Sequence, residues 1–313
     1  MFFEGSEKKI EIELSFGLDD LRQKPHSFWE ELVEQAHAKI LSQIDSEECT
    51  AYLLSESSLF VWKNRITLIT CGRTTLVNAA KYFISQFQSN DIESVIFERK
   101  NEYFPDKQPT NFYQDVIELN KFIEGKAFRF GNADEHHLYV YHMNKPFTPE
   151  ESDKTLEVLM YDLDKDVLNL FQKENLKSEE LRLKSGIENL FEGFKIDDYV
   201  FEPFGYSLNG LKGSEYFTIH VTPQDLGCYV SFETNANIQK NYDEVLARVL
   251  EIFRPRSFDT IYFHPDQSLA VEVPNFSQRS FVEGSMGCGY HITYAHYFHK
   301  NLVELEPVEL KEL

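Results

Sequence analysis

The chain has 313 residues, of which 42% are hydrophobic and 14% aromatic; this is enough apolar material for a sizeable core and too much for a disordered chain. Its net charge of -21 repels nucleic acid and anionic lipid, and it attracts small cations such as polyamines. The sequence has no run of about 18 apolar residues, so we predict no membrane-spanning helix. Charges within the first ten residues lead us to expect no signal peptide.

Along the first half, residues 9–16 alternate between apolar and polar side chains, which predicts a strand whose Glu11 and Glu13 face away from its apolar side. Ser27 followed by Glu30 is typical of a capping box, here opening a helix that runs to about residue 40. The same half is predicted to contain strands over residues 51–54, 58–61, 66–70 and 137–143, and helices over residues 74–87 and 111–122.

In the second half, the patterns predict strands over residues 215–221, 228–234 and 260–264, and a helix over residues 243–253. Adjacent strands followed by helices indicate an α+β fold, with antiparallel sheets and helices on their outer faces. No long linker or low-complexity stretch divides the chain. We therefore expect a single domain over residues 1–313, with a frayed acidic tail after Glu304.

The four cysteines lie far apart, without a CxxC pair, at Cys49, Cys71, Cys228 and Cys288. They are too few for a disulfide scaffold and too scattered for a zinc site. We therefore predict free thiols, a cytoplasmic location and no metal site.

The sequence contains no P-loop, no GxGxxG after a strand, no HExxH and no GxSxG. Its most distinctive segment is YLLSESSLF at residues 52–60, followed by TCG at residues 70–72. On composition alone, serines after a glutamate indicate only a turn or the edge of a strand.

Further blocks stand in order along the chain: FFEGSEK at residues 2–8, FGYSLNG at 204–210, FTIHVTP at 217–223 and YVSFETN at 229–235. Together with LSESSLF and TCG, these blocks resemble the S-adenosylmethionine decarboxylase family of the eukaryotic type. The resemblance covers about the first 235 residues and is only weak after Phe253.

This resemblance implies a four-layer α/β/β/α sandwich, in which two antiparallel sheets from two similar halves pack between helical layers. It also implies that the chain cuts itself between Glu56 and Ser57, giving a β chain of residues 1–56 and an α chain of residues 57–313. The Ser57 hydroxyl would attack the Glu56 carbonyl, and elimination would leave a covalent pyruvoyl group as the cofactor. By the same resemblance, His220 is the base for processing and Ser207 stabilises its intermediate.

In this family the pyruvoyl group forms a Schiff base with S-adenosylmethionine and accepts electrons as carbon dioxide leaves. The resemblance makes Cys71 the proton donor. The other active-site matches are the adenine-stacking Phe3 and Phe201, the carboxylates Glu4 and Glu7, and Glu56 as a substrate-binding residue.

Gln224 stands where the family has a glutamate that binds the ribose hydroxyls. A glutamine side chain accepts through one oxygen only, so it lacks the bidentate charged acceptor. This departure leaves open a related pyruvoyl enzyme that acts on another amino acid, such as ornithine or arginine.

A second group of residues matches the site that binds the activator putrescine in animal members: Glu11, Asp153, Thr155, Glu157 and Glu233. The family's lysine just before TCG is missing, because Ile69 and Thr70 occupy those positions. Activation by putrescine therefore stays open.

The leading hypothesis is an enzyme that makes decarboxylated S-adenosylmethionine, the aminopropyl donor for spermidine and spermine, and family precedent suggests a homodimer of processed protomers. A third hypothesis is an inactive paralogue that activates a partner subunit. The presence of Ser57, Cys71, Ser207 and His220 argues against this third hypothesis.

Overall fold

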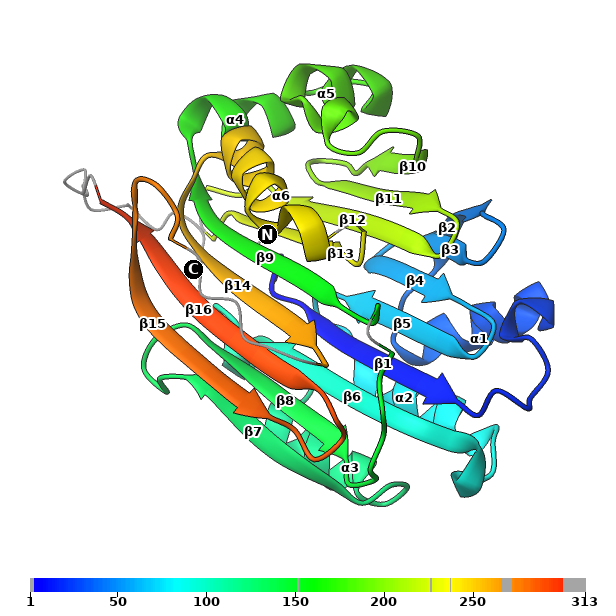
Figure 1. Ribbon diagram of the computed structural model, residues 1–313. Helices are drawn as coiled ribbons and strands as arrows, with labels where there is room; N and C mark the ends of the chain where they lie inside the picture. The colour runs from blue at the N-terminus through cyan, green and yellow to red at the C-terminus, as the bar shows by residue number, and fades with distance from the viewer. Residues whose placement is uncertain (1–2, 151, 226, 237, 266–271, 301–313) are drawn as a thin grey trace.

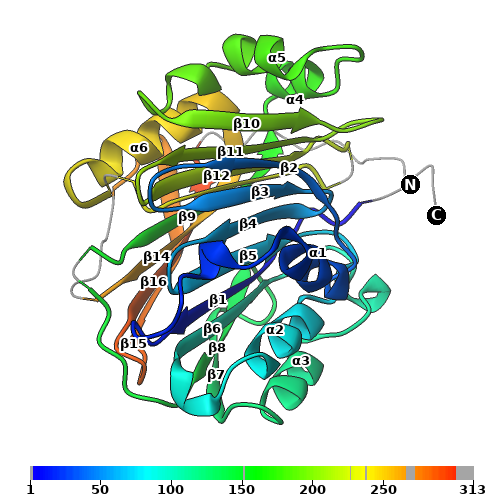
Figure 2. The same ribbon diagram turned by 90° about the vertical axis from the view of Figure 1, so that its right-hand side faces the viewer.

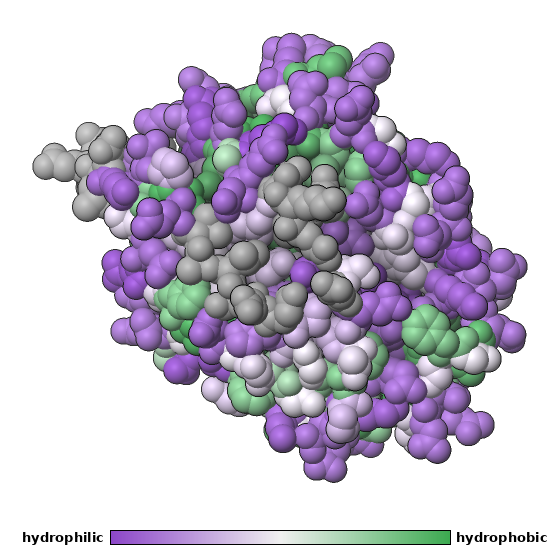
Figure 3. Space-filling view, viewed as in Figure 1, coloured by the Kyte–Doolittle hydropathy of each residue, from purple (hydrophilic) through white to green (hydrophobic). Residues whose placement is uncertain are grey.

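The computed structural model describes residues 3–300, apart from residues 151, 226, 237 and 266–271. The described strands form two eight-stranded antiparallel sheets that face each other, and helices cover their outer sides (Figure 1, Figure 2). The predicted α+β sandwich of four layers is therefore confirmed. The face of the molecule in Figure 3 is mostly hydrophilic, with apolar residues scattered over it, in keeping with the acidic composition.

The first sheet has the order β2-β3-β4-β5-β1-β6-β8-β7. Its strands are β1 (Lys8–Leu14), β2 (Ile40–Asp45), β3 (Thr50–Leu54), β4 (Ser57–Val61), β5 (Arg65–Thr70), β6 (Ile92–Lys100), β7 (Gly125–Gly131) and β8 (His137–Met143).

The second sheet has the order β10-β11-β12-β13-β9-β14-β16-β15, which is the first order with every number raised by eight. Its strands are β9 (Thr155–Leu163), β10 (Lys195–Val200), β11 (Tyr206–Lys212), β12 (Glu215–Thr222), β13 (Tyr229–Thr234), β14 (Pro255–His264), β15 (Phe276–Ser285) and β16 (His291–His299). Equivalent strands contact each other across the sandwich, β2 with β10, β3 with β11 and β7 with β15. The two similar halves are thus packed face to face.

Two apolar layers lie between the sheets and their helices. On the first sheet, Ile10 and Ile12 of β1 share a buried cluster with Trp29, Phe83 and Phe112, which come from α1 (His26–Gln35), α2 (Leu76–Ser85) and α3 (Phe112–Leu119). The second sheet packs in the same way against α4 (Lys165–Phe171), α5 (Ser178–Ser185) and α6 (Ile238–Phe253). Short 3-10 helices span Leu21–Gln23, Ser89–Asp91, Pro105–Lys107 and Ile187–Asn189.

The space between the sheets is different in character. Because side chains alternate along a strand, the apolar face of β1 meets the helices and its polar face, with Lys9 and Glu11, points at the second sheet. Apolar clusters flank this polar centre on both sides, one around Tyr161 and Tyr294 and the other around Phe60. The polar face of the predicted strand is thus an interior surface.

The predicted strands near residues 9–16, 51–54, 58–61, 66–70, 137–143, 215–221 and 228–234 are confirmed, with ends that differ by at most two residues. The predicted capping box is wrong. The first helix starts at His26 behind Pro25, so Ser27 lies inside its first turn, and it ends at Gln35. The chain then turns into β2, whose exposure alternates along the strand.

The region after Phe253 supplies three strands, β14 to β16, of which only residues 260–264 were expected. All four cysteines are buried and free. None of the helices in the described ranges is long and apolar enough to cross a membrane. The tail after Glu304 lies outside the described residues.

Candidate active site

Ser57 and His220, which are 163 positions apart in the sequence, meet between the sheets. Ser57 opens β4 and is buried, and its Oγ lies 3.0 Å from Nε2 of His220 on β12. The other ring nitrogen, Nδ1, lies 2.9 Å from Oγ of Ser207, the residue directly opposite His220 on β11. The structure therefore brings together the three residues to which the resemblance assigned processing roles.

The environment of His220 favours its neutral form. Burial lowers the pKa of its imidazole to about 3, because the charged form loses its hydration. At neutral pH the ring therefore has a free lone pair, and a nitrogen 3.0 Å from a hydroxyl can accept its proton.

The carbonyl oxygen of Glu56 has two donors from Cys71. The backbone N–H of Cys71 donates to it at 2.9 Å, and the thiol donates at 3.4 Å. Donors fixed in this way stabilise negative charge that develops on a carbonyl oxygen under attack. Ser57, which follows this carbonyl, has a φ of +130°, and such a conformation costs a non-glycine residue about 1–3 kcal/mol. The strained backbone of Ser57 and the two hydrogen-bond donors to the Glu56 carbonyl thus lie at the same peptide bond, the one between Glu56 and Ser57.

Burial raises the pKa of three acidic groups around Ser57. Burial raises the pKa of the Cys71 thiol well above its usual value, and the charges of Glu56 and Glu7 raise it further. Burial also raises the pKa of Glu7 to about 8, against the effect of a 2.6 Å hydrogen bond from Ser231. For Glu56, burial raises the pKa to about 7. At neutral pH the Cys71 thiol is therefore protonated, so it carries a proton that a general acid can supply.

The residues expected to bind the substrate lie around the N-terminal segment. Phe3 is 37% exposed, its ring packs against Gly72, and its backbone N–H donates to Oε1 of Gln224 at 3.1 Å. The Glu4 carboxylate accepts from the backbone N–H of Phe104 at 3.1 Å.

Phe201 lies in the turn between β10 and β11, with its ring edge-to-face against Tyr199. Because Tyr206 pairs with Val221, this turn and the turn that carries Gln224 are at the same end of the second sheet. Phe201, Gln224 and Phe3 therefore lie at one end of the sandwich.

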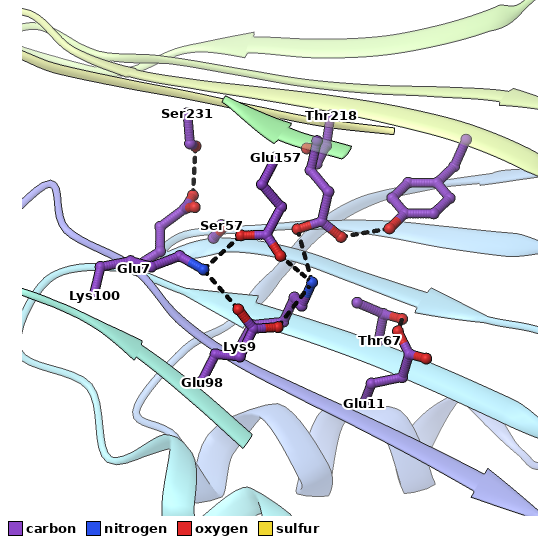
Figure 4. Close-up of polar contacts among 12 residues, drawn as sticks. Glu7, Lys9, Glu11, Ser57, Thr67, Glu98, Lys100, Glu157, Thr218 and Ser231 are labelled. Carbon is purple, nitrogen blue, oxygen red and sulfur yellow. Dashed lines mark hydrogen bonds and ion pairs between the residues drawn. The ribbon is translucent and has the colours of Figure 1, made fainter. Parts of the chain in front are cut away.

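Behind this site, a buried ion cluster joins the two sheets (Figure 4). Lys9 on β1 forms ion pairs with Glu157 on β9, with Glu98 at 3.1 Å and with Glu233 at 3.4 Å. Lys100 on β6 pairs with the same Glu98 at 2.9 Å and Glu157 at 2.5 Å. Their side chains are at most 5% exposed. We call these five residues the ion cluster.

The remaining residues of the predicted diamine site lie beside the ion cluster. Arg65 pairs with Asp153 at 2.7 Å, and the Tyr290 hydroxyl donates to the same carboxylate. The Glu11 carboxylate accepts from Thr67 at 3.3 Å. The cavity that remains among Lys9, Glu11, Glu98, Asp153, Thr155 and Tyr290 has a volume of about 10 Å³, which is room for about one water molecule.

Motif reasoning missed the cations of this region and some neighbours of His220. Lys9 could have been found, because it shares the polar face of the predicted strand with Glu11. Thr218, whose Oγ1 lies 2.8 Å from Nε2 of His220, stands two positions earlier on the same strand. Arg65 and Lys100 carry no local signal, since only the packing of the sheets brings them to the carboxylates.

Comparison with known proteins identifies the family of the chain. A family model described as adenosylmethionine decarboxylase matches residues 1–298, well past Phe253, where the motifs indicated only weak resemblance. The chain therefore belongs to the adenosylmethionine decarboxylase family.

Proteins named S-adenosylmethionine decarboxylase proenzyme are similar along most of the chain. The one from Xenopus laevis is 38% identical and covers 84% of this chain and 83% of its own length. The one from Dictyostelium discoideum is 34% identical, with 94% and 85% covered. Among solved structures, Trypanosoma brucei AdoMetDC-delta26 monomer aligns with a TM-score of 0.62 at 27% identity, covering 78% of this chain and 99% of that one.

The ion cluster yields a stability prediction. Lys9→Met leaves buried carboxylates without one of their cations, and we expect it to lower the free energy of unfolding by about 3–5 kcal/mol. Lys184→Met, which removes the exposed pair with Glu180, is the control and should leave the urea midpoint unchanged. Equal midpoints for the two variants at pH 7 would contradict the role given to Lys9.

Proposed function

We propose that the chain is a proenzyme that cuts itself between Glu56 and Ser57 and then decarboxylates S-adenosylmethionine with a pyruvoyl group derived from Ser57. The observation that carries the proposal is the pairing of the Ser57 hydroxyl with a neutral, buried His220, beside a carbonyl with two donors. Family membership favours the adenosyl substrate over ornithine or arginine. It also favours an active enzyme over an inactive paralogue.

The cut begins with transfer of the Ser57 hydroxyl proton to His220. The hydroxyl oxygen adds to the Glu56 carbonyl carbon, whose oxygen gains negative charge beside the two Cys71 donors. Breaking the carbon–nitrogen bond then leaves an ester, and the nitrogen takes up the proton. Ser207 holds the other side of the His220 ring, so it positions the base.

The ester is removed by elimination. A base takes the α-proton of Ser57, the bond from Cβ to the ester oxygen breaks, and the new carboxylate of Glu56 leaves. Water then replaces the nitrogen, which departs as ammonia, and the pyruvoyl group remains. His220 fits the role of the base because its neutral ring lies against the Ser57 side chain.

The residues around Ser57 fit the decarboxylation step. The pyruvoyl carbonyl supplies the electron sink for loss of carbon dioxide. Cys71, which keeps its proton because of burial, delivers it to the α-carbon of the product. Phe3 and Phe201 offer aromatic faces to adenine, and carboxylates such as Glu4 complement the cationic substrate.

We further propose that the two fragments stay together as one domain. The fragment of residues 1–56 contains β1, which is hydrogen-bonded on both sides, to β5 and to β6 of the longer fragment. Assembly of two such protomers into a homodimer stays a prediction, which sedimentation can check. The cytoplasmic location also stays a prediction.

The purified protein should show two polypeptides on a denaturing gel. The longer one should be lighter by one ammonia than a chain that starts with serine, which intact mass spectrometry measures. Ser57→Ala has no hydroxyl to attack Glu56 and should stay uncut and inactive. Ser55→Ala changes a serine of the same turn, whose Oγ accepts a hydrogen bond from the backbone N–H of Lys39, and it should be cut normally. An intact, active wild-type chain would refute self-processing.

Cys71→Ala separates processing from turnover. The backbone N–H keeps the shorter bond to Glu56, at 2.9 Å, so cleavage should continue. Loss of the thiol removes general-acid help, which contributes about 10²–10⁴-fold, and release of carbon dioxide from carboxyl-labelled substrate should fall by that factor. Cys49→Ala, another buried free cysteine, is the control. Near-normal turnover of Cys71→Ala would remove the proton-donor role.

The predicted putrescine site leads to a different proposal. We propose that lysine and arginine side chains of the chain itself pair with the carboxylates that would bind the diamine. Lys9, Lys100 and Arg65 already pair with Glu98, Glu157, Glu233 and Asp153, and the cavity left is about 10 Å³. Burial also raises the pKa of Glu11, and that of Glu233 to about 7, so these carboxyl groups take up protons more readily. The cavity left among these residues therefore has no room for a diamine, and three cations of the chain already occupy the site.

Wild-type activity should therefore change less than about twofold when millimolar putrescine is added. Lys100→Ala opens space beside Glu98 and Glu157 and should create a dependence on the diamine, while butane-1,4-diol, which has no charge, should not replace it. Strong activation of the wild type would show that the site admits the diamine.

A further inference from the structure

A group of three side chains lies apart from Ser57 and the ion cluster. Asp259 on β14 and His296 on β16 are directly opposite in the antiparallel register, and His136 reaches them from the turn between β7 and β8 of the other sheet. Nδ1 of His296 is 2.5 Å from one oxygen of Asp259, and Nδ1 of His136 is 3.3 Å from the other. The ligand atoms of the three residues lie within 4.8 Å of one another.

The Asp259 carboxylate of this group is buried, and burying a charged carboxylate costs free energy. The side chains of Asp259 and His296 are 1% and 2% exposed. In the part of the chain that the structure describes, Asp259 contacts the Nδ1 atoms of the two histidines and the Tyr161 hydroxyl. Burying a carboxylate away from water is costly unless a cation or hydrogen-bond donors compensate its charge.

We propose that His136, Asp259 and His296 bind a divalent transition-metal ion of the zinc type. Two imidazole nitrogens with one carboxylate oxygen are a ligand set that suits such ions. Bonds of about 2.0–2.1 Å in a tetrahedral site place ligand atoms about 3.3 Å apart. The His136–Asp259 separation already has this value, whereas the His296–Asp259 separation of 2.5 Å would have to lengthen.

The surroundings of the three residues suit a metal site in two further ways. The hydroxyl of Tyr161 donates to Asp259 at 2.8 Å, as outer partners do when they orient ligating carboxylates. The side chain of His136 is 29% exposed and stands on a turn, so it provides an entry path and can move the short distance that closes the ligand set.

The position of the site suggests what the ion stabilises. The ring of Tyr161 packs edge-to-face on Tyr229 at 5.6 Å, and Tyr229 lies directly against Gly5. Gly5 follows Phe3 and Glu4, which line the proposed substrate end. The ion would therefore tie both sheets together beside the segment that binds the substrate, without contacting Ser57.

The test uses the processed protein without any tag, treated with a chelator and dialysed. Titration with Zn²⁺ in a calorimeter should show one site per chain, and Co²⁺ should give the visible absorption of a tetrahedral site. His136→Gln should weaken Zn²⁺ binding by at least about 100-fold and abolish the cobalt spectrum. Because His136 is on a partly exposed turn, this variant should fold, which circular dichroism verifies.

His137→Gln is the matched control, since His137 is the next residue but lies outside the group of ligands, with Nδ1 on the Glu135 carbonyl. It should bind Zn²⁺ like the wild type. A wild-type chain that binds no stoichiometric ion, or equal binding by His136→Gln, would show a purely hydrogen-bonded network and overturn the proposal. Tyr161→Phe, which keeps all three ligands, should weaken binding by about tenfold.

Discussion

The pairing of Lys9 and Lys100 with Glu98 and Glu157 joins the two sheets at the polar centre of the space between them. In most sandwiches apolar side chains fill this space. Here the main apolar layers lie outside, between each sheet and its helices, so charge pairing is what commits the sheets to each other at the centre. Removing one partner from such a group costs far more than the group contributes as a whole, which makes the arrangement specific as well as stable.

The same dry interior prepares the reactive groups. Burial disfavours the charged form of an ionisable group. It therefore lowers the pKa of His220 and raises the pKa values of Cys71 and Glu7. One physical cause thus produces a neutral base and protonated acids within one site. The two lysines of the nearby ion cluster pair with the three carboxylates of that cluster.

How far the sequence predicts the protein depends on how local each signal is. Alternation along β1 predicts the strand and the side of Glu11, because both follow from the geometry of one strand. It does not reveal that this side faces another sheet. The helix after Ser27 is predicted to run to about residue 40, although it ends at Gln35. The strand β2 is not predicted, because the alternation of residues 40–45 is short and competes with helical spacing. Ordered motifs find Ser57, Ser207 and His220, whereas His136, Asp259 and His296 have no shared motif and meet only through the packing of two sheets.

The identical strand order of the halves has a consequence for their ancestry. β4, which carries Ser57, and β12, which carries His220, occupy the same place in their sheets. The nucleophile and its base are thus counterparts in two copies of one architecture, and a single copy would hold one reactant without the other. Duplication of one half followed by divergence accounts for the shared strand order, and in the present chain each half supplies one member of the pair. Neither half can therefore be lost without loss of the pair.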